Sequence, residues 1–156
     1  MSAQHTPDAA LVARVLVGFA LAYLLGFERE LRGSAAGDRT FALVGASSAS
    51  VAAVTATTPQ ALAGIITGVG FIGGGVILRS EAGSIRGVTT AATIFAVAAI
   101  GVVVGTGHLA LGALITALVL LILELRFLPV LRMLDAQRYA ARFRNDSGEP
   151  DDGHHP

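Results

Sequence analysis

The chain has 156 residues, of which 53% are hydrophobic and 14% are charged. Because soluble domains carry about 25% charged residues, this composition excludes an ordinary soluble domain and predicts an integral membrane protein. Eleven arginines balance eleven acidic residues, and the absence of lysine and cysteine excludes a lysine-dependent P-loop, disulfides and thiolate metal sites.

The chain begins with a polar segment over 1–8 that we expect to be disordered. Residues 1–10 contain no basic residue, so 11–27 is interpreted as a retained first membrane span and not as a signal peptide. A charged connection follows, and 40–54 is the predicted second span. This span contains Ser47, Ser48 and Ser50. A helix this polar should lie inside the bundle, with its hydroxyls bonded to neighbouring helices or to its own backbone.

The third predicted span, 60–78, is a charge-free run of 19 residues. Thr58 is its expected N-cap and Pro59 its first helical residue. On a helical wheel its glycines form two faces, one with Gly64, Gly68 and Gly75 and the other with Gly70 and Gly74. Since small side chains let helix backbones approach closely in membranes, we expect this helix to be the packing centre of the protein. Residues 68–73 also match G-x-G-x-x-G, but the context that a dinucleotide site needs is missing.

Two further spans are predicted. The fourth, 88–104, bears the small pair Gly101 and Gly105, and the fifth, 109–128, is rich in leucine and should face lipid. Residues 129–144 carry four arginines and are expected to form a cytoplasmic surface helix, and 145–156 reads as a disordered polar tail. The predicted fold is therefore an all-α transmembrane domain over 9–128 with about five helices.

The arginines indicate the orientation of these spans. Ten of the eleven lie in the connection after the first span, in the connection after the third, or in the C-terminal segment, and the two alternate connections have none. Because cytoplasmic loops carry the arginine excess, the N-terminus should lie outside and the C-terminus in the cytoplasm. Only Arg14 does not fit this pattern.

Both charged connections should then meet at the cytoplasmic face. Glu28 and Arg32 are four residues apart and can pair along a helix end. Charges that flank spans usually anchor and orient the helices, which is the simpler interpretation of this group. The alternative is a polar cluster that forms a mouth or a docking surface. Glu124, near the inner end of the fifth span, is open to the same two interpretations.

The spans lack the residues that several functions need. None has a carboxylate near its midplane, so a proton relay or a dehydrated divalent-cation site has no ligands of the usual kind, although hydrated magnesium can still pass. His108 is the only histidine outside the termini and should lie at the face opposite most of the acidic residues, which argues against a Ser/His/Asp set. We therefore expect no enzyme, no cofactor and no metal site.

Four ordered motifs point to a family. They are GFERE at 26–30, AGDRT at 36–40, GVGFIGGGVI at 68–77 and IRGVTTAA at 85–92. Together with AAIG at 98–101, they closely resemble the membrane domain of the MgtC/SapB family over 11–125.

This resemblance implies a bacterial inner-membrane protein linked to magnesium homeostasis, to growth at low magnesium and, in some pathogens, to survival inside host cells. It implies a regulator or accessory of other membrane machinery more than a magnesium transporter. Carried over by motif, the functional cytoplasmic cluster comprises Glu28, Arg29, Glu30, Gly37, Arg39, Thr40, Arg86, Gly87, Thr89 and Thr90. Asp38 stands where the family usually has an apolar residue. Longer members carry a soluble C-terminal domain, so this chain resembles the short, membrane-only branch.

The leading hypothesis is an accessory or regulatory membrane protein that works through helix contacts with a partner or with copies of itself, without nucleic acid. The alternative is a small transporter or pore for magnesium or another small solute, lined by Ser47, Ser50, Thr67, Thr89 and Thr90. A third possibility is a purely structural membrane subunit.

Overall fold

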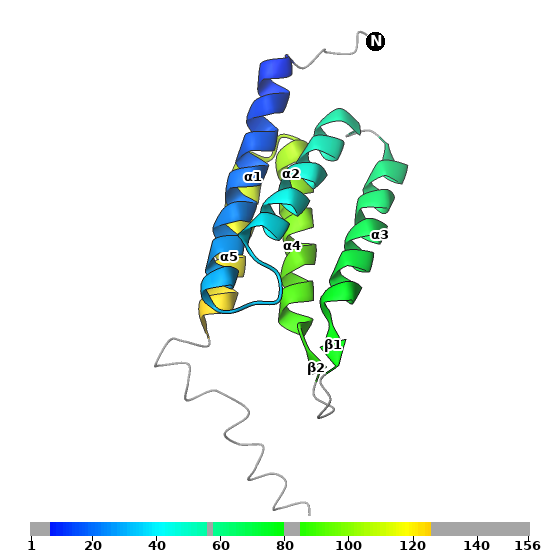
Figure 1. Cartoon of the computed structure of the whole chain (residues 1–156). Coiled ribbons are helices and arrows are strands. Elements are labelled where there is room, and N and C mark those ends of the chain that lie inside the picture. Colours follow the sequence, from blue (N-terminus) through cyan, green and yellow to red (C-terminus); the bar gives the residue numbers. More distant parts are fainter. Residues whose placement is uncertain (1–6, 56–57, 80–84, 126–156) are drawn as a thin grey trace, which may run out of the picture. The chain divides into compact units, whose positions relative to one another are not determined.

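The computed structural model describes residues 7–55, 58–79 and 85–125. Its helices are α1 (Asp8–Leu31), α2 (Asp38–Thr55), α3 (Pro59–Val76), α4 (Val88–Gly105) and α5 (Leu109–Glu124) (Figure 1). Between α3 and α4, strands β1 (Leu78–Arg79) and β2 (Ile85–Arg86) form an antiparallel hairpin in which Leu78 lies opposite Arg86. The all-α prediction is confirmed apart from this hairpin, which the sequence did not predict.

Three helices, α1, α3 and α4, are long and apolar enough to cross a membrane, and α5 is a shorter apolar helix of 16 residues. The number of helices that span the membrane therefore stays a prediction. The helix ends differ slightly from the expected ones, since α1 already begins at Asp8 and α5 ends at Glu124. The surface helix predicted over 129–144 and the tail predicted over 145–156 lie outside the described residues. The segment over 1–8 that was expected to be disordered also lies outside them, apart from residues 7 and 8, and there the prediction is wrong at Asp8, which begins α1.

The core of the bundle lies between α1, α2 and α4. Its largest fully buried side chains are Leu25 from α1, Phe41 from α2, and Ile94, Val97, Ile100 and Val104 from α4. Glycines let these three helices approach closely. A Cβ atom added at Gly18 would lie 2.7 Å from the Cβ of Ala49, and one added at Gly101 would lie 2.6 Å from the carbonyl oxygen of Gly45. Close backbone approach at small residues is how helices associate in membranes.

Helix α2 has the predicted interior position, but among the described residues its serines are hydrogen-bonded as predicted only at Ser50 and not at Ser47 or Ser48. It buries seven residues, including Phe41, Ser48 and Ala49. The hydroxyl of Ser50 donates to the carbonyl oxygen of Ala46 at 2.8 Å, one turn back along the same helix. A moderately polar helix is tolerated here because α1 and α4 cover much of its surface.

The prediction that the glycine-rich helix is the packing centre is wrong within this chain. In α3 only Val69 and Gly73 are buried, and the helix contacts α4 on that side. A Cβ atom at Gly64, Gly68, Gly70, Gly74 or Gly75 would meet nothing within 4 Å. A helical wheel identifies residues that share a face but does not indicate which face is covered. Here the covered strip contains Val69 and Gly73 and lies between the two glycine faces. The packing of the glycine faces against another chain stays a prediction.

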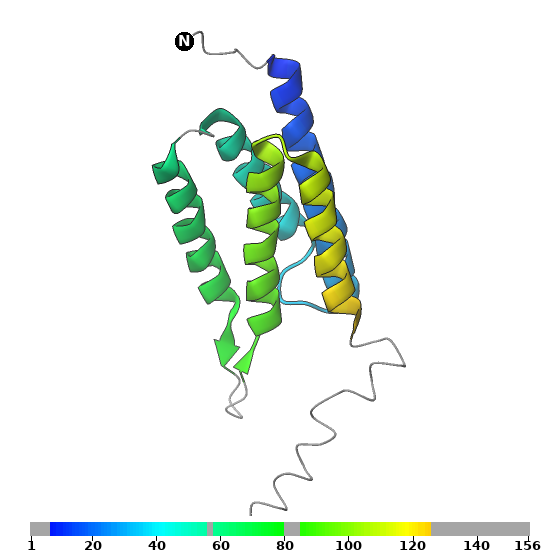
Figure 2. The same cartoon turned by 180° about the vertical axis from the view of Figure 1, so that it is seen from behind.

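Helix α5 follows α4 through a tight turn, and Figure 2 shows α4 between α3 and α5. Gly112 and Thr116 are its buried residues, and Leu111, Leu114 and Leu118 are exposed. A Cβ atom at Gly112 would collide with Val104 of α4, so α5 also packs through a small residue. The exposed leucines agree with the predicted lipid-facing surface.

Arg14 has a local role at the end of the bundle opposite the hairpin. Its Nη1 donates to the carbonyl oxygen of Gly105 at 3.3 Å, at the C-terminus of α4. In the turn that follows, Gly107 has a φ of 101°, and a Cβ atom there would lie 3.1 Å from Nη2 of Arg14. A cation at a helix C-terminus is favourable because the last carbonyl groups carry partial negative charge.

Candidate functional site

The two charged connections meet at one end of the bundle, as predicted (Figure 1). Ser34 lies between α1 and α2, and Thr90 lies in the first turn of α4, directly after the hairpin. Their hydroxyl oxygens are 2.8 Å apart and share a hydrogen bond. This bond joins the first connection to the beginning of α4, and Thr90 is only 3% exposed.

Glu30 and Gly37 organise the beginning of α2. The backbone N–H of Asp38 donates to Oε2 of Glu30 at 3.0 Å. A Cβ atom at Gly37 would lie 2.8 Å from the same oxygen, so a larger residue would displace the carboxylate. An anionic acceptor at a helix N-terminus stabilises the helix because the first N–H groups have no partner within it. Glu30 thus acts as a cap supplied by α1 to α2.

Glu28 and Arg29 are the least satisfied polar side chains described in the cluster. Oε1 of Glu28 lies 3.5 Å from Nε of Arg32 in the predicted i,i+4 pair, and the Glu28 side chain is 13% exposed. Both carboxylate oxygens of Glu28 and Nε of Arg29 are buried without a hydrogen bond. Buried polar atoms are almost always hydrogen-bonded, so these atoms are exceptions that are costly to leave unpaired.

Gly87 forms the turn that connects the hairpin to α4. Its φ is 89°, in the left-handed region, and a Cβ atom on it would collide with the carbonyl oxygen of Val76 at the end of α3. Its own carbonyl oxygen accepts the N–H of Ala91 at 2.8 Å. Glycine is therefore required both by the backbone conformation and by the close approach of α3.

The remaining residues of the cluster are distributed around this end of the bundle. Arg39, Arg86 and Thr89 are exposed, and Thr40 is half-buried. Within the part of the chain that the structure describes, neither Arg39 nor Arg86 forms an ion pair with an acidic side chain. The cluster consequently presents two exposed arginines, whereas Glu28, Arg29 and Thr90 are more buried.

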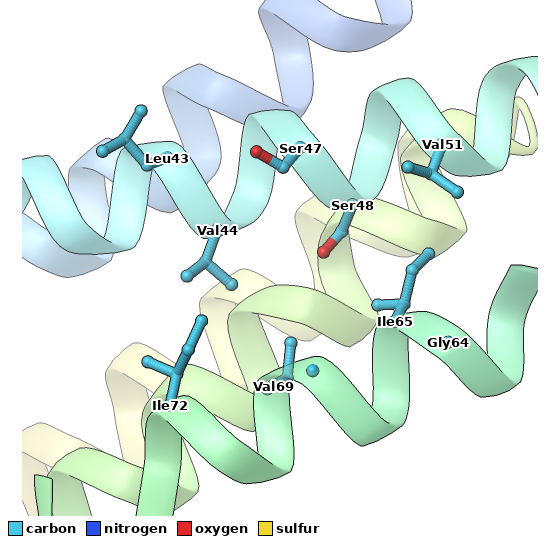
Figure 3. Close-up of a pocket in the computed structure, with 10 residues that line it drawn as sticks. Leu43, Val44, Ser47, Ser48, Val51, Gly64, Ile65, Val69 and Ile72 are labelled. Carbon is cyan, nitrogen blue, oxygen red and sulfur yellow. The ribbon is translucent and has the colours of Figure 1, made fainter. Parts of the chain in front are cut away.

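A groove of about 290 Å³ lies between α2 and α3 (Figure 3). Its lining is aliphatic except for Ser47 and Ser48 of α2, which lie across from Gly64 and Gly68 of α3. Of the five hydroxyl residues suggested for a pore, only Ser47 lines it. Ser50 and Thr67 donate to carbonyl groups of their own helices, and Thr90 bonds Ser34. The single chain therefore does not gather these five hydroxyls into one lining.

The described residues contain no group of three or more His, Cys, Asp or Glu side chains that could hold a metal ion. At the opposite end of the bundle, His108 is exposed and its Nδ1 lies 3.1 Å from Oγ1 of Thr106.

The sequence did not indicate the structural contacts of two residues, Ser34 in the site and Arg14 at the opposite end of the bundle. Ser34 carried no motif signal, because a serine in a polar connection is unremarkable by itself. Arg14 did carry a sequence signal, because it was the only arginine outside the orientation pattern. In the structure it bonds the C-terminal end of α4.

The chain is similar to proteins of one known family. A family model described as the MgtC family matches residues 15–129. The chain is 36% identical over 131 residues to the "Putative magnesium transporter YhiD" of Escherichia coli (strain K12), which covers 74% of this chain and 60% of that protein. It is 34% identical over 137 residues to "Protein MgtC" of Brucella abortus (strain 2308), covering 84% of this chain and 57% of that protein.

A third relative is closer to this chain in length. "Protein SrpB" of Synechococcus elongatus is 37% identical over 131 residues, which cover 71% of each chain. The chain thus spans about 60% of the length of the first two relatives. No solved structure matches it.

Proposed function

The chain belongs to the MgtC family, and from this premise we propose that it is an accessory or regulatory protein of the bacterial inner membrane that supports magnesium homeostasis. It acts through contacts with a membrane-protein partner or with copies of itself. The observation that carries the proposal is the family match over 15–129, which includes every residue of the cytoplasmic cluster and all of α2, α3 and α4.

The chemistry of the cluster supports a contact function. Glu28 and Arg29 hold buried atoms without hydrogen bonds, and Arg39 and Arg86 are exposed. A partner that supplied a donor to Glu28 and an acceptor to Arg29 would satisfy groups that are costly to leave unpaired. A relative's name mentions magnesium transport, and for this chain we propose a role beside transport and not the passage of the ion itself.

The same proposal includes a topology. Helices α2 and α5 join α1, α3 and α4 as membrane spans, so that the charged end of the bundle faces the cytoplasm and the N-terminus lies outside. The arginine distribution supports this orientation, because Arg29, Arg32, Arg39 and Arg86 all lie at or next to the end where the two connections meet.

Growth at limiting magnesium tests the role. A strain that lacks the gene should grow normally at high magnesium and poorly at low magnesium, and the intact gene should restore growth. Glu28→Gln keeps the size of the side chain and removes the charge from the buried end of the cluster. We expect it to restore growth poorly although the protein is present in the membrane at normal amounts.

Asp8→Asn is the matched control, since it makes the same acid-to-amide change at the other end of α1 and should restore growth fully. A deletion strain that grows normally at every magnesium concentration would overturn the magnesium role. Equal restoration by the Glu28 and Asp8 variants would remove Glu28 from the functional cluster.

The transporter alternative is supported by the printed name of the Escherichia coli relative. Purified protein in liposomes distinguishes the two functions, because a transporter needs no partner to move its solute. Magnesium-dependent dye signals should stay at the level of empty liposomes under any imposed gradient. A flux that scales with the amount of protein would replace the accessory function with transport.

A further inference from the structure

The groove between α2 and α3 is lined by a buried serine whose hydroxyl forms no hydrogen bond with the described residues. Ser48 is 3% exposed and lines the groove, and its side chain points toward α3 in Figure 3. Other hydroxyls in the bundle bond a carbonyl group one turn back, as Ser50, Thr67, Thr93 and Thr116 do. Among the described residues neither Ser48 nor Ser47 has such a bond. In an apolar phase an unpaired hydroxyl is costly, so the groove lacks its hydrogen-bonding occupant.

The opposite wall of the groove favours a helix as that occupant. Gly64 and Gly68 are four residues apart on α3, so they lie on one face, and a Cβ atom at either position would meet nothing within 4 Å. This is the spacing at which two membrane helices bring their backbones together. An acyl chain could fill the aliphatic part of the groove but would leave both serine hydroxyls unpaired.

We propose that the occupant is α3 of a second copy of this chain, which packs on Gly64 and Gly68 and offers its backbone to Ser47 and Ser48. Charge supports this choice, because α3 has no charged residue and two copies can approach without bringing like charges together in the membrane. All copies insert with the same orientation, so their α3 helices run parallel. A two-fold axis along the membrane normal then lets the same surface of each copy contact the other.

This inference rests on the proposed function and deepens it by identifying the surface and the partner. It also gives the uncovered glycines of α3 a role that the single chain does not provide. A second copy would cover the Gly64 and Gly68 face and leave the Gly70 and Gly74 face outside the contact.

Cysteine cross-linking tests the interface, because the chain contains no cysteine of its own. Gly64→Cys and Gly68→Cys should each give a covalent dimer when full-length protein in native membranes is oxidised. A disulfide forms only where the two Cα atoms come within roughly 4.4–6.8 Å, so the product reports direct contact. Gly74→Cys is the matched control, since it lies on the same helix in equally open space but on the other glycine face. It should remain monomeric.

Equal cross-linking at all three positions would indicate random collisions and would overturn the proposal. The absence of a dimer at Gly64 and Gly68 would do the same and would leave lipid or another protein as the occupant.

Energy transfer between labelled copies in liposomes provides a second measurement. Gly68→Ile should weaken association at least roughly tenfold and Ser48→Ala roughly threefold, whereas Gly74→Ile should change nothing. Because the space at Gly68 and Gly74 is open within the chain, neither isoleucine should unfold it. Equal association of the Gly68 and Gly74 variants would contradict the interface.

Both measurements use protein produced in cells grown at high magnesium, so they are independent of the growth phenotype. A missing dimer with normal restoration of growth would thus refute only the interface, and a silent deletion with a specific dimer would refute only the magnesium role.

Discussion

At Gly101 the backbones of α4 and α2 come so close that a single methyl group has no room. A Cβ atom there would lie 2.6 Å from the carbonyl oxygen of Gly45 and 2.8 Å from the Cβ of Ser48. Gly64 is also a helical glycine, but a Cβ atom at that position meets no neighbour. The value of a glycine to the fold thus depends on what the adjacent helix places opposite it.

Gly101→Ala should therefore lower the free energy of unfolding by about 1–3 kcal/mol, because α2 and α4 must separate to accommodate the methyl group. Gly64→Ala should leave stability unchanged or raise it by up to about 1 kcal/mol, since alanine favours helix over glycine. Denaturant titration in detergent, followed by circular dichroism, measures both. Equal losses at the two positions would mean that the close contact between α2 and α4 does not form.

Glu30 offers a second test at the scale of one residue. Glu30→Ala removes the oxygen that accepts the N–H of Asp38, and we expect a loss of about 1 kcal/mol, typical of a lost N-terminal cap. Glu30→Gln retains an acceptor and should recover part of this loss. The same titration measures these variants, and an alanine variant as stable as the glutamine variant would show that the contact does not stabilise α2.

At the scale of the elements, the connection from α3 to α4 is more structured than its charges suggested. The hairpin turns the chain back, and Gly87 brings the beginning of α4 against the carbonyl group of Val76. The hydroxyl bond between Ser34 and Thr90 then ties this connection to the one between α1 and α2. These contacts hold the charged residues at one end of the bundle.

Gly87→Ala tests this connection, and Gly33→Ala is the control. Gly33 also has a positive φ, 68°, but a Cβ atom on it would meet nothing within 4 Å. Gly33→Ala should cost roughly 1–2 kcal/mol, the usual penalty for the left-handed conformation, and Gly87→Ala should cost more because it adds the collision with Val76. Unfolding measurements on both variants check the order, and a Gly33 variant that is the less stable of the two would contradict it.

Most of the elements and the interior position of α2 could be predicted from the sequence. Apolar runs indicate membrane helices, and a helix that contains several serines is unfavourable against lipid and is therefore expected inside the bundle. The sequence also identified Gly101 and Gly105, whose backbones contact α2. It failed at α3, where the wheel identified two glycine faces but not the neighbour of either. Which face is covered depends on contacts between distant segments, such as that of Gly73 with Ala91, which no local pattern encodes. The same limit explains why Ser34 was missed.

For the whole molecule, the two ends of the bundle differ in charge, and this difference underlies the proposed orientation. One end holds the cluster and the hairpin, and the other holds Arg14 and the turn after α4. Arg14 bonds the carbonyl group of Gly105, so its position has a cause in the local structure and does not weigh against an arginine-rich cytoplasmic face. The orientation therefore leads to a prediction about which end meets the cytoplasm.

Labelling of single cysteines tests this orientation, again because the chain has none of its own. Ala35 and His108 are both exposed and lie in turns at opposite ends of the bundle. A maleimide that cannot cross the inner membrane should label His108→Cys in intact spheroplasts and should label Ala35→Cys only after the membrane is opened. The reverse pattern would place the cluster outside the cell and would overturn the proposed orientation. Labelling of both variants in sealed spheroplasts would mean that the turns do not lie on opposite sides of the membrane, and an even number of spans between them would follow.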